Sequence, residues 1–135
     1  MQPTASAIQR PFIPNRGFAV LAGCFLLVSI VVETAYSWGR LADAYFLVKV
    51  VGWILIAWGA TRIRAGNPRG LTYLAAGWGW MGANFWRAIA DRLTDISAGQ
   101  TLRLGSIEIA FTGSCLTVCV AGLILTLVNA NRNDR

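Results

Sequence analysis

Residues 17–36 read "GFAVLAGCFLLVSIVVETAY", and this stretch holds a single ionisable acid, Glu33, three residues before its end. A helix needs about 20 mainly apolar residues to cross a hydrocarbon core about 30 Å thick, and this segment has that length. Only helices and closed barrels satisfy the backbone inside a bilayer, and the stretch lacks the apolar–polar alternation of barrel strands. It therefore predicts a membrane-spanning helix.

Three further segments of similar character follow, at 44–60, 70–90 and 106–130. The chain is 56% hydrophobic and 13% charged, with a mean hydropathy of +0.54, whereas soluble domains carry roughly 25% charged residues. We predict an all-α integral membrane protein with four transmembrane helices, arranged as an up-down bundle or as a lipid-exposed helical subunit. An irregular arm at 1–16 would precede the helices, and a short tail at 131–135 would follow them.

The charge distribution predicts the orientation of these helices. The arm, the connection between the second and third segments, and the tail together hold seven arginines and one aspartate, which accounts for the whole net charge of +6. The positive-inside rule places these three parts in the cytoplasm, so we expect both termini inside a bacterial inner membrane. Nucleic acid is not an expected partner, because the basic residues lie between apolar runs rather than along one face with interleaved aromatics.

The residue types that are missing limit the chemistry. The chain has no histidine, which excludes His-ligated haem and removes the commonest general acid or base. Its three cysteines, Cys24, Cys115 and Cys119, lie within apolar runs and are interpreted as small hydrophobes. The chain has no nucleophile elbow or phosphate-binding loop. We expect no enzymatic activity, no metal site, and no cofactor bound covalently or through histidine.

Polar side chains near the outer ends of the predicted spans are the candidate site. Ionisable residues within a bilayer are costly and usually face a partner or a water-filled cavity. Two interpretations stay open: structural ion pairs with interface anchoring, or an outer-side polar pocket. The expected cross-helix contacts are Glu33–Lys49 and Arg87–Glu108, and Asn84 is expected to bond across helices. The full cluster comprises Glu33, Lys49, Asn84, Arg87, Asp91 and Glu108.

The third segment also predicts a packing surface. Small residues at helical spacing let backbones approach closely in lipid, and here they form a seam of Ala75, Gly79, Gly82 and Ala83. Four tryptophans, Trp53, Trp78, Trp80 and Trp86, are candidates to contact a neighbouring subunit or a flat apolar ligand such as a quinone, a carotenoid or a lipid.

Two short stretches resemble small four-span families. "SIVVETAY" at 29–36 resembles the first helix of small multidrug exporters, which depend on a carboxylate, although Glu33 lies near a helix end. "NFWR" at 84–87 is similar to the third span of small proteins linked to polyprenol-phosphate sugar translocation. Neither likeness extends beyond a few residues, so no family is assigned.

Two functions follow as expectations. The first is a non-catalytic accessory subunit of a larger inner-membrane complex, for example an energy-converting or electron-transfer complex, with membrane lipids and other integral membrane subunits as partners. The alternative is a small oligomeric transporter or flippase component that uses the outer-side polar cluster.

Overall fold

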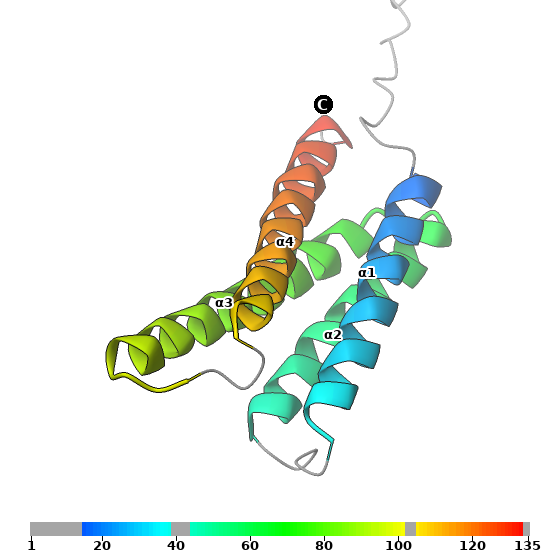
Figure 1. The fold of residues 1–135 in the computed structure, drawn as a ribbon. Coiled ribbons are helices and arrows are strands. Elements are labelled where there is room, and N and C mark those ends of the chain that lie inside the picture. Colours follow the sequence, from blue (N-terminus) through cyan, green and yellow to red (C-terminus); the bar gives the residue numbers. More distant parts are fainter. Residues whose placement is uncertain (1–14, 39–43, 102–104, 134–135) are drawn as a thin grey trace, which may run out of the picture.

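The computed structural model describes residues 15–38, 44–101 and 105–133. Across these ranges it contains four helices and no strand: α1 (Asn15–Tyr36), α2 (Ala44–Arg64), α3 (Gly70–Ser97) and α4 (Ser106–Asn133) (Figure 1). The all-α fold is confirmed. Most of the predicted arm, residues 1–14, lies outside the described residues.

The helices extend further than the sequence predicted. The second and third predicted helices ended at residues 60 and 90, whereas α2 continues to Arg64 and α3 to Ser97. Residues 131–133, assigned to a tail, belong to α4. The predicted helix ends lie where the apolar runs stop. α2 and α3 continue through the polar residues that follow and end near a glycine turn.

The turn between α2 and α3 shows such an ending. Gly66 has a φ of 79°, in the left-handed region where glycine is favoured because it has no β-carbon. Its amide donates to the Ile63 carbonyl at 2.9 Å, and the Asn67 amide donates to the Arg62 carbonyl at 3.0 Å. This short, bonded turn makes α2 and α3 antiparallel neighbours.

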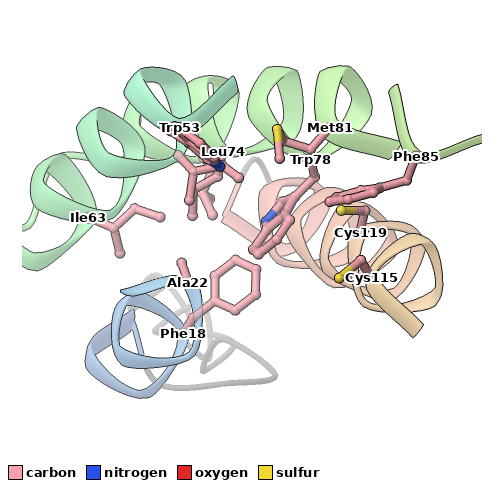
Figure 2. Packing of buried hydrophobic residues seen from close by; sticks show 12 residues of the cluster. Phe18, Ala22, Trp53, Ile63, Leu74, Trp78, Met81, Phe85, Cys115 and Cys119 are labelled. Atoms are coloured by element: carbon pink, nitrogen blue, oxygen red, sulfur yellow. The ribbon is translucent and has the colours of Figure 1, made fainter. Parts of the chain in front are cut away.

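The core is centred on α3, which packs against both α2 and α4, while α1 packs on α2. Trp78 of α3 is fully buried, and its ring centroid lies 5.0 Å from that of Phe25 in α1. Figure 2 shows Trp78 among Phe18 and Ala22 of α1 and Cys119 of α4. One tryptophan therefore contacts side chains that converge from several helices.

Within the described residues, the predicted seam on α3 approaches another helix at Gly82, where an added β-carbon would lie 3.5 Å from Cβ of Cys119 in α4. A β-carbon on Gly79 would meet nothing within 4 Å, and Ala83 is exposed. The close approach to α2 is made two residues earlier, where a β-carbon on Gly77 would lie 2.6 Å from Cγ1 of Ile56. Small residues occur on both sides of α3, and the bulky side chains of Leu74, Trp78 and Met81 decide which side faces the core.

Three of the four helices are long and apolar enough to cross a membrane: Arg16–Tyr36, Ala44–Arg64 and Ser106–Arg132. α3 is not among these three candidates. Its first half mixes glycine and tryptophan with its aliphatic residues, and its second half carries four charged side chains, Arg87, Asp91, Arg92 and Asp95.

Candidate functional site: a charged pocket at one end of the bundle

A pocket of about 370 Å³ opens where the ends of three helices meet the second half of α3. Because consecutive helices run in opposite directions, the end of α1 and the starts of α2 and α4 all lie in the lower part of Figure 1. The second half of α3 supplies the rest of the pocket lining. All six residues of the predicted polar cluster line this pocket. The complete lining is Glu33, Tyr36, Ser37, Tyr45, Phe46, Lys49, Asn84, Arg87, Ala88, Asp91, Arg92, Asp95 and Glu108.

Glu33 and Lys49 form an ion pair between α1 and α2, as the sequence predicted. Their side chains are only 10% and 16% exposed, respectively. The Lys49 ammonium also lies 6.0 Å from the centroid of the Phe85 ring. A charge with so little access to water needs its partner, so this contact ties the two helices together at the pocket wall.

Glu108 bonds to Arg92, not to the predicted Arg87. Its Oε1 accepts from Nε of Arg92 at 2.6 Å and from the Tyr36 hydroxyl at 2.8 Å. The guanidinium is held further by a 2.9 Å bond from Nη1 to the Ala88 carbonyl. Arg92 was missed because the predicted helix stopped at residue 90. The two additional turns of α3 carry Arg92 to the start of α4.

Arg87 instead faces α2. Its Nη2 donates to the Tyr45 hydroxyl at 3.1 Å, and that hydroxyl donates to Oδ2 of Asp91 at 3.2 Å. Arg87 also pairs with Asp91 of its own helix at 3.9 Å, and these two side chains are 68% and 53% exposed. Tyr45 was not predicted because a tyrosine at the start of a span is usually an interface residue.

Asn84 makes a bond within its own helix rather than across helices. Its Nδ2 donates to the Trp80 carbonyl at 2.8 Å. Its amide still lines the charged pocket, close to the middle of α3. The predicted interhelical bond is therefore wrong, because the backbone carbonyl one turn earlier satisfies the donor.

A second, smaller cavity of about 210 Å³ adjoins the charged pocket between α1 and α4. It shares Glu33, Tyr36, Arg92 and Glu108 with the charged pocket, and the rest of its lining is mainly apolar: Val32, Ile107, Phe111 and Thr112. The Arg92–Glu108 pair therefore stands on the boundary between a polar space and an apolar one.

The four candidate tryptophans divide into two pairs. Trp53 and Trp78 are buried, and Nε1 of Trp53 donates to Oγ of Ser29 at 3.0 Å, so their positions serve packing within the chain. Trp80 and Trp86 are 42% and 64% exposed. Nε1 of Trp80 donates to the Val48 carbonyl at 2.7 Å. Of the four candidates, these two present an aromatic surface outward.

Charged side chains dominate the lining of the pocket. Three cationic and four carboxylate side chains line the pocket, and most of them bond to one another. Within the described ranges, no group of three or more histidine, cysteine, aspartate or glutamate side chains is placed to hold a metal ion.

The fold and site together define an all-helical chain with three helices suited to a membrane and a charge-paired pocket at one helix-bundle end. The chain matches no protein-family model, no curated protein sequence and no solved structure.

Proposed function

We propose that this chain is a four-span inner-membrane protein with both termini in the cytoplasm, and that it acts as a non-catalytic accessory subunit of a larger membrane complex. The observation that carries the proposal is a stripe on α3 that none of the other described helices covers. Ala76, Ala83, Trp86 and Ala90 are exposed along it, and Gly79 faces open space.

This stripe has the composition of a helix–helix contact in lipid, where small residues permit close backbone approach. Its spacing of three and four residues keeps it on one side of α3. The charges of the neighbouring pocket are largely paired within the chain, so they need no partner from outside. The stripe, which includes the exposed Trp86, is therefore the surface that we assign to a partner helix. Such a helix would also complete the apolar surroundings that α3 needs to cross the membrane.

Purification in a mild detergent, followed by mass spectrometry of the associated chains and cofactors, tests the subunit role. We expect distinct partner polypeptides in fixed stoichiometry with the wild-type chain and their loss with Gly79→Leu. The matched control is Gly113→Leu on α4, where an added β-carbon also meets nothing within 4 Å. A preparation that holds only copies of this chain would contradict the proposal.

Topology reporters test the four-span arrangement separately. Reporters after Gly66 and at the C-terminus should respond from the cytoplasm, and one after Gly99 from the outer side. The α2–α3 turn carries Arg62, Arg64 and Arg69, consistent with a cytoplasmic position. If the reporter after Gly99 responds from the cytoplasm, α3 does not cross the membrane.

A transporter or flippase component is the second candidate, and one observation favours it. The charged pocket shares its wall with the apolar cavity between α1 and α4, a combination that suits a molecule with a polar head and an apolar tail. Reconstituted protein should then accelerate the movement of a fluorescent phospholipid between the leaflets of liposomes. The double variant Glu33→Gln with Lys49→Met, which leaves no buried charge, should abolish that acceleration while the chain stays folded, and an inactive wild-type chain would exclude this candidate.

A further inference from the structure

A groove of about 680 Å³ lies between α1 and α2 at the end of the bundle opposite the charged pocket. Its residues come from the start of α1 and the end of α2, two helix ends that lie in the upper part of Figure 1. The lining consists of Arg16, Ala19, Val20, Gly23, Leu26, Ala57, Ala60, Thr61 and Arg64.

The interior of the groove is shaped for a narrow apolar chain. Small side chains from both helices, Ala19, Gly23, Ala57 and Ala60, keep it open, and a β-carbon on Gly23 would meet nothing within 4 Å. Thr61 adds little polarity, since its hydroxyl donates to the Trp58 carbonyl of its own helix at 2.9 Å.

Two arginines, one from each helix, line the groove at the helix ends. Arg16 begins the apolar part of α1, and Arg64 is the last residue of α2. Both are exposed, and among the described residues neither has a salt-bridge partner. The groove lining contains no acidic side chain. Two cations therefore flank the mouth of an apolar groove without a described counter-ion.

The length of the groove matches one leaflet of a bilayer. Arg16 and Leu26 are ten residues apart on α1, which corresponds to about 15 Å at 1.5 Å per residue. Half of a hydrocarbon core about 30 Å thick has the same depth. A lipid whose phosphate lies at the arginines would thus extend one acyl chain along the whole groove.

We propose that this groove binds an anionic phospholipid of the cytoplasmic leaflet, with its phosphate between Arg16 and Arg64 and one acyl chain along Gly23. The inference rests on the membrane insertion of the proposed function, but not on the accessory-subunit role, because the site lies entirely within this chain. Charge complementarity favours an anionic phospholipid over an apolar helix, which would leave both guanidinium groups without counter-ions.

Native mass spectrometry of the purified chain tests the proposal, with phosphatidylglycerol and phosphatidylcholine of identical acyl chains as probes. A basic residue near a membrane surface contributes about 1 kcal/mol to anionic-lipid attraction, which corresponds to about fivefold in affinity. We expect Arg16→Gln and Arg64→Gln each to weaken phosphatidylglycerol binding about fivefold, and the double variant roughly thirtyfold. Phosphatidylcholine, whose choline cation offsets the charge of its phosphate, should bind the wild-type chain more weakly and lose less affinity in these variants. Arg69→Gln is the charge-matched control, because Arg69 belongs to the same turn but does not line the groove.

A second variant tests the acyl chain rather than the headgroup. Gly23→Leu fills the groove from a position with free space and should remove tight binding of phosphatidylglycerol, whereas Gly113→Leu should not. The proposal fails if Arg69→Gln weakens binding as much as Arg64→Gln, or if Gly23→Leu still binds the lipid fully. Either result concerns the purified chain alone, so it is separate from whether partner polypeptides co-purify.

Discussion

The indole of Trp78 in α3 packs directly on Gly122 in α4. A β-carbon at Gly122 would lie 2.7 Å from both Cδ2 and Cε2 of the ring, well inside van der Waals contact. Because the same indole contacts Phe25 of α1, the missing side chain at Gly122 sets how closely α4 approaches the centre of the bundle.

Gly122→Val should therefore destabilise the fold. The added side chain must displace either Trp78 or α4, and overpacking of this kind costs about 1–3 kcal/mol. Thermal unfolding in a fixed detergent measures the effect. Gly113→Val is the matched control on the same helix, where the β-carbon meets nothing within 4 Å. Equal losses in both variants would show that helix propensity, and not the contact with Trp78, is responsible.

Removal of one partner of the Glu33–Lys49 pair should destabilise the fold more than removal of both partners. Lys49→Met leaves the Glu33 carboxylate only 10% exposed and without its ion-pair partner, and the loss of one partner of a buried pair costs about 3 kcal/mol. The double variant Glu33→Gln with Lys49→Met should recover much of that loss, because no charge remains buried. A double-mutant cycle on unfolding free energies measures the coupling, and additive effects would contradict it.

The helices and the location of the polar residues were predictable from sequence, because both depend on local pattern and membrane depth. The predicted starts of the second, third and fourth helices, at residues 44, 70 and 106, coincide with those of α2, α3 and α4. Because successive helices alternate in direction, Glu33, Lys49, Arg87 and Glu108 were expected at one end of the bundle, and all four line the same pocket there.

The specific partners were harder to predict, because they depend on the rotation and length of α3. Arg87 and Arg92 differ by five residues, which at 100° per residue places them on different sides of the helix. Only the bulky residues that face the core fix which arginine meets Glu108. The same rotation determines that Gly77, and not Gly79, approaches α2.

Arg92 should contribute more to stability than Arg87, although Arg87 was the expected partner of Glu108. The Arg92 side chain is 18% exposed and bonds to Glu108 at 2.6 Å, whereas Arg87 is 68% exposed and lies 3.9 Å from Asp91. Exposed pairs contribute about 0–1 kcal/mol, so Arg87→Gln should have little effect on unfolding. Arg92→Gln should cost about 2–3 kcal/mol, since it leaves a buried carboxylate with fewer donors. Equal effects of these charge-matched variants would refute the assignment.

Two glycines on α3 should respond in opposite directions to the same substitution. A β-carbon at Gly77 would lie 2.9 Å from the backbone nitrogen of Ile56, which cannot move without shifting α2. Gly77→Ala should therefore destabilise the purified chain by about 1–3 kcal/mol. Gly79→Ala meets no atom within 4 Å and should gain about 0.5–1 kcal/mol from the better helix propensity of alanine. Unfolding measurements on both variants in the same detergent decide the matter, and a destabilising Gly79→Ala would mean that the uncovered stripe of α3 packs against another part of the chain.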